Sequence, residues 1–311
     1  MGRLLKQLIV NRLTRAAAFT VIRPILRNSY SRELLNLAYE RLPNRGKAVF
    51  GTLVARVFWD QPHNVNGLWR ARFLTEKLCI PLRAESINLD WIYALSVETH
   101  DRPILDTYEN IIQSPTPPKT FIDAGANFGM HSLIFSKLGV RTVAFEPNPV
   151  CGAYAATIFA LNKVAPEWHP VALGSGDGSV DLFFPERETW LGTTVSNIAD
   201  NLGANLRVVS VPLKALDTYS DSITDPVLIK IDVEGAEVPA LRSGIELIHR
   251  HRPLIIFEAN DAAAKTAMAE FMNEVGYQIH SLPFDPARTQ PELTQTEFLR
   301  DPQTNFVAKP A

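Results

Sequence analysis

Residues 120–129 read T-F-I-D-A-G-A-N-F-G, and the interpretation of the whole chain starts from them. A short apolar run meets an acid, Asp123, and a loop of small residues follows, which includes Gly125 and Asn127. Apolar residues at helical spacing then run from 130 to 138. The pattern predicts a strand, a tight turn and a helix. In an open α/β sheet, ligands bind at such a turn.

The spacing of this loop argues against a dinucleotide. The dinucleotide fingerprint is G-x-G-x-x-G, in which backbone N–H groups and a helix N-terminus hold a pyrophosphate. Here the order is D-x-G-x-N-x-G, so Asn127 replaces the second glycine and Asp123 precedes the first. A carboxylate suits a cation better than a diphosphate, and S-adenosylmethionine carries an ammonium and a sulfonium group. The alternative without a ligand is a helix cap that follows a buried strand.

A second acid follows the next expected strand. Glu146 stands at the end of residues 141–145, directly before Pro147. A carboxylate at the end of the second strand can accept hydrogen bonds from both ribose hydroxyls of a nucleoside. The loop and Glu146 together predict a site for S-adenosylmethionine.

Length and composition limit the possible classes of protein. The 311 residues allow one large α/β domain with an extension. The net charge of −2 does not predict a nucleic-acid partner. Two cysteines, Cys79 and Cys151, suggest neither a disulfide framework nor a thiolate metal site, and we expect reduced thiols in a cytoplasmic protein. No stretch is apolar over the roughly 18 residues that a transmembrane helix needs.

Residues 1–115 are predicted to form a mostly helical extension, with helices at 34–39 and 71–78. The first 32 residues hold seven basic side chains before the first acid, Glu33. Apolar residues lie between them, which is typical of basic, imperfectly amphipathic helices. Such helices attach to the inner face of a membrane or to a partner, or else they dock on their own domain. Both interpretations stay open. The proline-rich run 114–118 is expected to be a stiff linker.

Residues 116–311 are predicted to form one α/β domain, because strand and helix patterns alternate along them. This alternation implies a doubly wound, mainly parallel sheet with helices on both faces. A β-hairpin insertion is expected after the third strand, formed by residues 179–184 and 206–211 around a polar loop at 186–205. The expected strands are 120–124, 142–145, 168–173, 227–233, 254–257, 277–281 and 305–308, and the expected helices are 130–138, 150–162, 216–219, 236–249 and 262–275.

A second distinctive segment, residues 230–237, reads K-I-D-V-E-G-A-E. Strand alternation would place Lys230, Asp232 and Glu234 on one face. Buried charges are costly unless they are paired, so the three residues form either a self-satisfied ion-pair cluster or part of a ligand site. Oxygen atoms of Asp232, Glu234 and Glu237 could in principle bind a divalent cation. We predict no metal, since Lys230 already supplies a positive charge.

Four segments together resemble the FkbM-type methyltransferases, and the resemblance covers about residues 121–277. It implies a class I, S-adenosylmethionine-dependent methyltransferase fold. It also implies the family's usual activity, which is methylation of a hydroxyl oxygen of a sugar or natural product. The segments are D-A-G-A-N-F-G at 123–129, F-E-P at 145–147, V-A-L-G-S-G-D-G at 171–178 and L-I-K-I-D-V-E-G-A-E-V-P-A-L-R-S-G at 228–244.

The resemblance also implies roles for single residues. The cofactor-binding positions would be the loop residues, the ribose acid, two residues beside the adenine and one beside the transferring methyl: Asp123, Gly125, Asn127, Glu146, Ala172, Leu173 and Asp232. An alcohol is a poor nucleophile while it holds its proton, so a positioned base is expected. Asp232 is the first candidate, followed by Glu234 and His131. His131 departs from the commoner family pattern, and a helix-surface histidine is its non-catalytic alternative.

The leading interpretation is therefore an S-adenosylmethionine-dependent O-methyltransferase that is cytoplasmic or peripheral to the inner face of a membrane. A scaffold that binds the cofactor without transferring methyl is one alternative, and a nicotinamide-dependent oxidoreductase is another. The acceptor is expected to be a small molecule or glycan rather than a nucleic acid. We expect residues 190–194 and the tryptophan-bearing N-terminal half to shape its pocket. The sequence indicates no oligomeric state.

Overall fold

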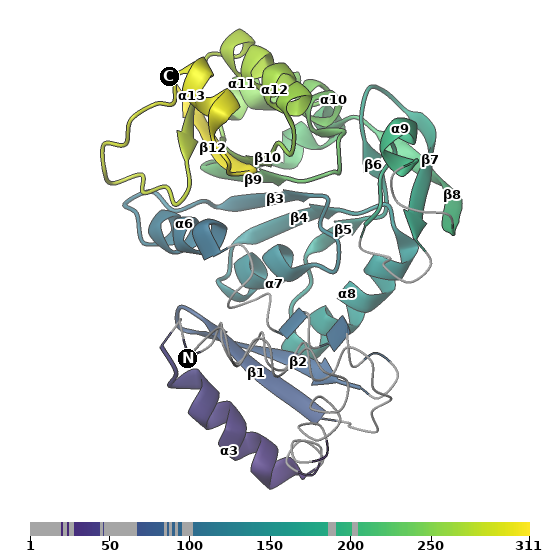
Figure 1. The fold of residues 1–311 in the computed structure, drawn as a ribbon, viewed down its shortest axis with the longest axis vertical. Helices are drawn as coiled ribbons and strands as arrows, with labels where there is room; N and C mark the ends of the chain where they lie inside the picture. Colours follow the sequence, from purple (N-terminus) through teal and green to yellow (C-terminus); the bar gives the residue numbers. More distant parts are fainter. Residues whose placement is uncertain are drawn as a thin grey trace. The chain divides into compact units, whose positions relative to one another are not determined.

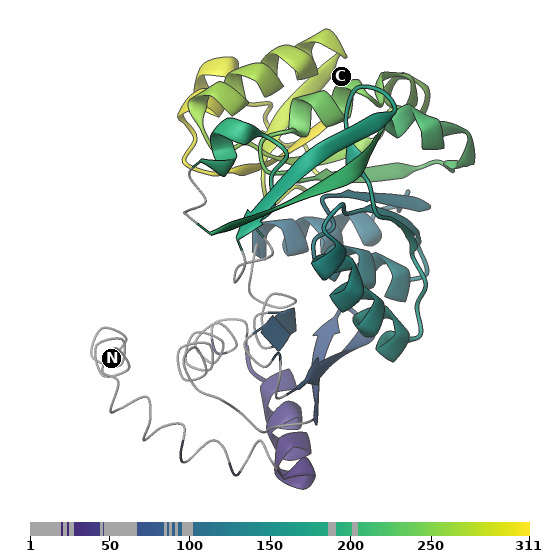
Figure 2. The same cartoon turned by 90° about the vertical axis from the view of Figure 1, so that its right-hand side faces the viewer.

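The computed structural model describes residues 28–43, 67–83, 102–185, 191–200 and 205–311, with single positions at 20, 24, 46, 86, 89, 90, 93 and 94. The chain forms two compact units, residues 1–102 and residues 103–311. Figure 1 and Figure 2 draw their elements from two directions. The basic segment 1–32 lies almost entirely outside the described residues. No helix in the described part is long and apolar enough to cross a membrane.

The first unit contains a helix and a two-stranded antiparallel sheet. Helix α3 (Ser29–Glu40) agrees with the helix expected at 34–39. Strands β1 (Gly67–Phe73) and β2 (Glu76–Leu82) pair along their whole length. The helix predicted at 71–78 is therefore wrong. Alternate residues of β1 are buried, and the short apolar run fits a period of two as well as a helical period.

The boundary between the units lies earlier than the predicted position at 115/116. Helix α6 (Arg102–Ile112) falls almost wholly in the second unit. Its Tyr108 ring contacts the rings of Phe121 and Phe135 edge-on, and Asn110 and Thr107 hydrogen-bond to the backbone of Phe284. Residues 103–115 are thus part of the larger fold and not of the extension.

The second unit is built on a seven-stranded sheet in the order β11-β12-β10-β9-β3-β4-β5. All pairs are parallel except those of β12, which runs antiparallel to β10 and β11. The sheet begins at β3, and the chain moves outward to β5. It then returns to β9 and moves outward through β10 to the edge strand β11, and β12 lies between β10 and β11. This is the predicted doubly wound, mainly parallel sheet. The strands are β3 (Thr120–Ala124), β4 (Arg141–Phe145), β5 (Glu167–His169), β9 (Val227–Ile231), β10 (Leu254–Glu258), β11 (Tyr277–Ser281) and β12 (Asn305–Pro310).

Helices cover both faces of this sheet (Figure 1). On one face lie α6, α7 (Met130–Lys137) and α8 (Pro149–Asn162), and on the other lie α10 (Glu237–Arg242), α11 (Ile245–His251) and α12 (Ala262–Glu274). The single helix predicted at 236–249 is divided in two at Ser243 and Gly244. The backbone N–H of Leu216, in the 3-10 helix η1 (Leu216–Ser222), donates to the Ser243 hydroxyl at this break. Helix α13 (Gln295–Arg300) was not predicted.

The predicted third strand, 168–173, is split between two sheets. Strand β5 stays in the main sheet, and β6 (Ala172–Leu173) pairs with β8 (Leu206–Lys214) in a separate three-stranded sheet. Pro170 lies at the break, where it has no N–H to donate to a ladder. Strand β7 (Gly178–Pro185) pairs with β8, which confirms the predicted hairpin insertion. A short helix, α9 (Ser196–Ala199), lies between β7 and β8 in the chain.

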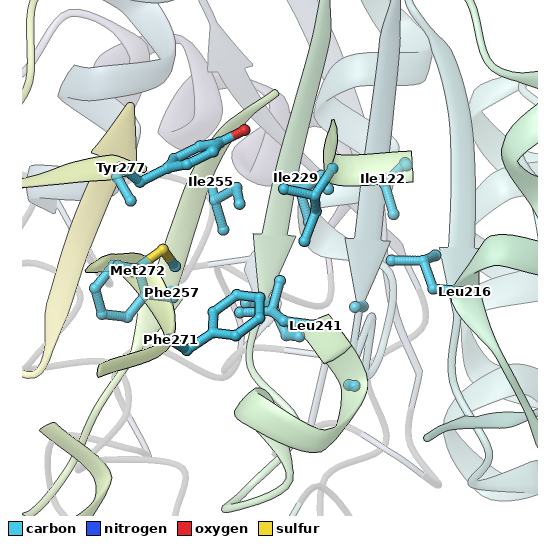
Figure 3. Packing of buried hydrophobic residues seen from close by; sticks show 14 of the residues in the cluster. Ile122, Leu216, Ile229, Leu241, Ile255, Phe257, Phe271, Met272 and Tyr277 are labelled. Carbon is cyan, nitrogen blue, oxygen red and sulfur yellow. The ribbon is translucent and has the colours of Figure 1, made fainter. Parts of the chain in front are cut away.

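The main core lies between the sheet and helices α10 to α12. Ile122, Ile229 and Ile255 come from three neighbouring strands and pack with Leu241 and Phe271 from the helices (Figure 3). Strands β3 and β9 are buried along their entire length, although each carries one ionisable residue. Those two residues, Asp123 and Lys230, lead to the candidate site.

Candidate active site

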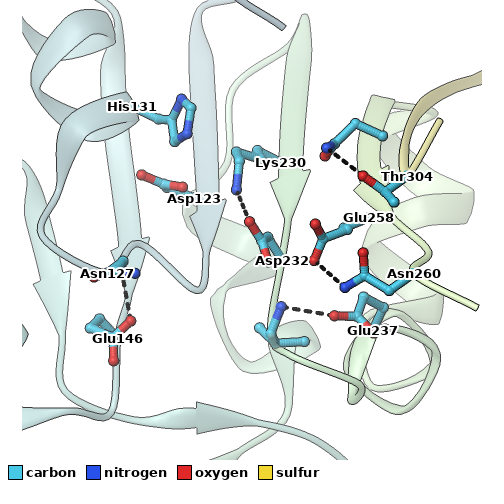
Figure 4. Close-up of polar contacts among 12 residues, drawn as sticks. Asp123, Asn127, His131, Glu146, Lys230, Asp232, Glu237, Glu258, Asn260 and Thr304 are labelled. Atoms are coloured by element: carbon cyan, nitrogen blue, oxygen red, sulfur yellow. Dashed lines mark hydrogen bonds and ion pairs between the residues drawn. The ribbon is translucent and has the colours of Figure 1, made fainter. Parts of the chain in front are cut away.

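Four strands bring acids to one edge of the sheet. Strands β3, β4, β9 and β10 are parallel, so their carboxyl ends lie side by side. Asp123 lies near the end of β3, Glu146 directly after β4, Asp232 directly after β9, and Glu258 at the end of β10. Figure 4 shows these side chains at the same edge. The centre of this edge, between β3 and β9, is the switch point where open α/β sheets bind ligands.

Asp123 is fully buried. Its Oδ2 accepts a hydrogen bond of 2.6 Å from the Ser132 hydroxyl of α7, whereas its Oδ1 is buried and accepts none. Burial raises the pKa of Asp123, and the positive charge of Lys230 opposes this effect. A buried carboxylate oxygen without a donor is costly, so this position favours a ligand that brings a donor or a positive charge.

Glu146 holds the glycine loop in place. Its Oε2 accepts from the backbone N–H of Asn127 at 2.8 Å, and its Oε1 accepts from that of Asn148 at 2.7 Å. The loop also donates two backbone N–H groups, from Gly125 and Ala126, to the carbonyl of Phe145. Burial raises the pKa of Glu146 to about 7. Each carboxylate oxygen has a second lone pair, so Glu146 can still accept hydroxyl donors.

Lys230 and Asp232 form an ion pair at the end of β9. The Lys230 Nζ lies 2.9 Å from Asp232 Oδ2. Lys230 is buried, while the Asp232 side chain is 32% exposed. Burial alone would lower the pKa of Lys230, but the charges of Asp232 and Asp123 raise it above its ordinary value. The lysine therefore stays charged between these two acids.

Glu234 does not continue the strand as predicted. Strand β9 ends at Ile231, and Glu234 lies in a turn with φ of +51°, so strand alternation no longer applies to it. Glu237 Oε1 closes this turn by accepting from the backbone N–H groups of Val233 and Gly235. Burial and the charge of Asp232 raise the pKa of Glu234 to about 7. Among the residues that the structure describes, no group of three or more His, Cys, Asp or Glu side chains could hold a metal ion.

His131 is buried and does not lie on a helix surface. Its Nδ1 is 3.2 Å from the hydroxyl of Tyr108, and the two rings meet edge-on. The residue therefore joins α7 to α6. The predicted role of His131 as a base stays a prediction.

Ala172 and Leu173 are buried, but they belong to the small sheet. They pair with Leu213 and Lys214 of β8, beyond the point where the main sheet's third strand ends at His169. The His169 ring stacks on Phe145 and tilts against Tyr219. The adenine-side role of Ala172 and Leu173 stays a prediction.

Comparison with known proteins then identifies the family. Residues 123–279, about half of the chain, match the model of the methyltransferase FkbM domain. The chain belongs to this family. Its matched region begins at Asp123 and contains the glycine loop, Glu146, the insertion and the Lys230–Asp232 pair.

Individual relatives of this FkbM methyltransferase are distant. Methyltransferase 1 of Beauveria bassiana (strain ARSEF 2860) is 29% identical over 149 residues, which cover 42% of this chain and 60% of the relative. The methyltransferase FkbM of Methylobacillus flagellatus KT has 16% identity and a TM-score of 0.38, covering 72% of this chain and 54% of that one. The tRNA (uracil-54, C5)-methyltransferase of Pyrococcus abyssi, solved with S-adenosyl-L-homocysteine, has 11% identity and a TM-score of 0.34. The match covers 78% of this chain and 43% of that one. The match thus spans less than two thirds of each relative's length.

The FkbM domain contains further polar residues beside the candidate site that sequence reasoning did not select. Ser132 supports Asp123 from α7. Glu258 is the last residue of β10 and Asn260 follows the strand, and the Asn260 Nδ2 donates to Glu258 Oε2 at 2.8 Å. Burial and the charge of Asp232 raise the pKa of Glu258 to about 8. An acid at the end of an apolar strand was visible in the sequence, but only the sheet order shows that this strand lies beside β9.

Proposed function

We propose that this FkbM methyltransferase transfers a methyl group from S-adenosylmethionine to a hydroxyl oxygen of a sugar, glycan or natural product. Methyl transfer itself follows from the family. The cofactor and the acceptor chemistry are inferred from the side chains at the carboxyl edge of the sheet, one half of the site at a time.

The observation that carries the cofactor assignment is the buried, unpartnered Oδ1 of Asp123. An ammonium group at the glycine loop would supply the missing donor and a compensating charge. Glu146, whose two oxygens each keep a free lone pair, suits the two ribose hydroxyls. When bound, S-adenosylmethionine supplies a methyl group on a positively charged sulfur. These donors and acceptors fit that cofactor better than they fit a pyrophosphate, which would bring negative charge to two acids.

Asp232 is the residue that we assign to the acceptor hydroxyl. It is partly exposed, it stands beside the cofactor half of the site, and it forms an ion pair with Lys230. A carboxylate in this position can accept the hydroxyl proton as the oxygen attacks the methyl carbon. Holding the two reactants in line accounts for much of the rate, and the fixed turn after β9 serves that purpose.

The insertion is the element that we assign to acceptor binding. The Thr193 hydroxyl donates to the backbone carbonyl of Glu234 at 2.8 Å, which joins the insertion to the turn after β9. Residues 191–194 thus lie within reach of the proposed transfer point. Trp190, Trp59 and Trp91 lie outside the described residues. Peripheral membrane contact through residues 1–32 and a cytoplasmic location are proposals that rest on the sequence alone.

The test combines a labelled methyl donor with fractionated cell extract. Wild-type protein is incubated with S-adenosylmethionine labelled with ¹³C in its methyl group, together with separate glycan, lipid and small-molecule fractions. The proposal expects a product that is heavier by one methyl group and whose ¹³C chemical shift is that of a methyl bound to oxygen. Asp232→Asn should lose this product, while Asp181→Asn, an exposed change on β7, should keep it.

The outcomes separate the alternatives. A methyl bound to nitrogen or carbon would refute the hydroxyl acceptor but keep the methyltransferase. Calorimetric binding of S-adenosylhomocysteine without transfer to any fraction would favour the scaffold. Binding of a nicotinamide dinucleotide instead would refute the cofactor assignment.

A further inference from the structure

Glu258 is the neighbour of Asp232 across two parallel strands. Phe257 of β10 pairs with Ile231 of β9, so the next residue of each strand, Glu258 and Asp232, emerges side by side at the carboxyl edge. Figure 4 shows Glu258 between Asp232 and Asn260. The two carboxyl groups therefore face the same part of the proposed site.

The donors and charges around this pair favour one position for a proton. Asp232 Oδ2 accepts from Lys230 Nζ at 2.9 Å, and Glu258 Oε2 accepts from Asn260 Nδ2 at 2.8 Å. The two carboxyl groups emerge side by side, and the negative charge of Asp232 raises the pKa of Glu258. Two carboxyl groups can share a hydrogen bond only if one of them is protonated. Because the Lys230 charge stabilises ionised Asp232, the proton belongs to Glu258.

We propose that Glu258 is a positioning residue whose protonated carboxyl group holds Asp232 as the carboxylate that faces the acceptor hydroxyl. The inference rests on the proposed function, since it assigns Glu258 a task in the same methyl transfer. Glu258 acts through Asp232 and does not itself take the acceptor proton. The row Lys230, Asp232, Glu258, Asn260 then forms one continuous set of hydrogen bonds along the edge of the sheet.

The electrostatic surroundings agree with this assignment. The charged groups that face Glu258 are Lys230 and Asp232 from the end of β9 and Glu234 from the turn that follows. Burial, together with the negative charges of Asp232 and Glu234, raises the pKa of Glu258 to about 8. Glu258 is therefore protonated at neutral pH and loses its proton as the pH rises through about 8.

The transfer step balances with this arrangement. The acceptor oxygen forms a bond to the methyl carbon, the carbon–sulfur bond breaks, and its electron pair goes to sulfur. The hydroxyl proton goes to the Asp232 carboxylate, while the Glu258 proton stays where it is. Asp232 is partly exposed and can then release the proton to water.

The test compares two substitutions of one residue in the ¹³C-methyl transfer assay with the active extract fraction. Glu258→Gln keeps a neutral donor beside Asp232, whereas Glu258→Ala removes it. We expect the wild-type rate to fall above about pH 8, because ionised Glu258 repels Asp232 and no longer donates to it. Glu258→Ala should be slower by about tenfold or more at pH 7. Glu258→Gln should recover much of that loss and show no fall near pH 8. Glu270→Gln, an exposed change on α12, is the control and should match the wild type.

A second measurement keeps this inference separate from the proposed function. Carboxyl ¹³C NMR of the full chain should show one group that titrates near pH 8, that is missing in Glu258→Gln, and that titrates at lower pH in Asp232→Asn. Absence of that group, or equal pH profiles for the wild type and Glu258→Ala, would overturn the role of Glu258. Wild-type protein that transfers no methyl to any fraction would refute the proposed function. The NMR titration would still determine whether Glu258 holds the proton beside Asp232.

Discussion

Gly125 lies directly against the backbone of Asp232. A Cβ atom added to Gly125 would stand 1.8 Å from the Asp232 carbonyl oxygen, and the Gly125 φ is +79°. The Asp232 N–H in turn donates to the carbonyl of Ala124. The loop after β3 and the turn after β9 are thus packed backbone to backbone, so the proposed cofactor and acceptor halves of the site share one rigid contact.

Gly125→Ala should separate these two loops. The left-handed backbone alone costs about 1–2 kcal/mol for a residue with a side chain, and the overlap with a backbone carbonyl adds to it. We expect a loss of more than about 2 kcal/mol of unfolding free energy in urea, together with loss of S-adenosylhomocysteine binding. Gly139→Ala is the matched control, because Gly139 has φ of +77° with nothing within 4 Å of the added Cβ. Equal losses of unfolding free energy in the two variants would show that the close approach of Gly125 to the Asp232 carbonyl does not contribute to the cost.

Asp123→Asn tests the partner of the ammonium group. The asparagine oxygen can still accept from Ser132, so the fold should be retained, but the negative charge is lost. We expect S-adenosylhomocysteine to bind at least about tenfold more weakly, since a charge-assisted hydrogen bond contributes about 1.5–3 kcal/mol. Methylthioadenosine lacks the ammonium group and should bind both forms equally. If calorimetry finds both ligands weakened alike, Asp123 supports the loop and does not contact the ammonium.

Cofactor binding should be coupled to the loss of a proton from Glu146. Its pKa of about 7 means that it is partly protonated at neutral pH, while ribose hydroxyls donate to the ionised form. Binding must then release a proton, and the affinity for S-adenosylhomocysteine should fall as the pH drops below about 7, by up to about tenfold per pH unit. Calorimetry in buffers with different ionisation enthalpies measures this release.

The control for this prediction is Glu146→Gln, which should bind weakly and release no proton. Glu234 also has a pKa of about 7 and remains in the variant. Any pH dependence of the affinity that the variant still shows therefore comes from a group other than Glu146. A wild-type affinity that stays constant from pH 6 to pH 8 would contradict ribose binding by the ionised Glu146.

The sequence predicted which residues of the candidate site follow a locally recognisable pattern. The loop after β3, Glu146 after β4 and Asp232 after β9 each follow a short apolar strand, and the structure has all three at one edge. Glu258 also ends such a strand, but its place beside Asp232 depends on β10 lying beside β9, which is a long-range pairing. Local patterns do not reveal which strands become neighbours.

Some of the errors had signals that were visible in the sequence. Pro170 lies within the predicted third strand and marks the break between β5 and β6. Thr294 and Glu297 form a capping box at the start of the missed helix α13. The misassigned strands β1 and β2 are different, because the eight-residue pattern at 71–78 fits a strand pair and a helix equally well. Only the pairing of the two strands decides between them.

The corrected boundary gives a final prediction, which concerns α6. A fragment of residues 103–311 keeps this helix, whereas a fragment of residues 116–311 begins at the boundary expected from sequence and lacks it. We expect the longer fragment to unfold cooperatively in urea. The shorter one should lose more than about 3 kcal/mol, the usual cost of removing one buried aromatic side chain, because the contacts of Tyr108 with Phe121 and Phe135 disappear. In the full chain, Thr107→Val should cost about 1–3 kcal/mol, since the buried Phe284 N–H loses its acceptor. Equal stability of the two fragments would show that the domain begins after α6.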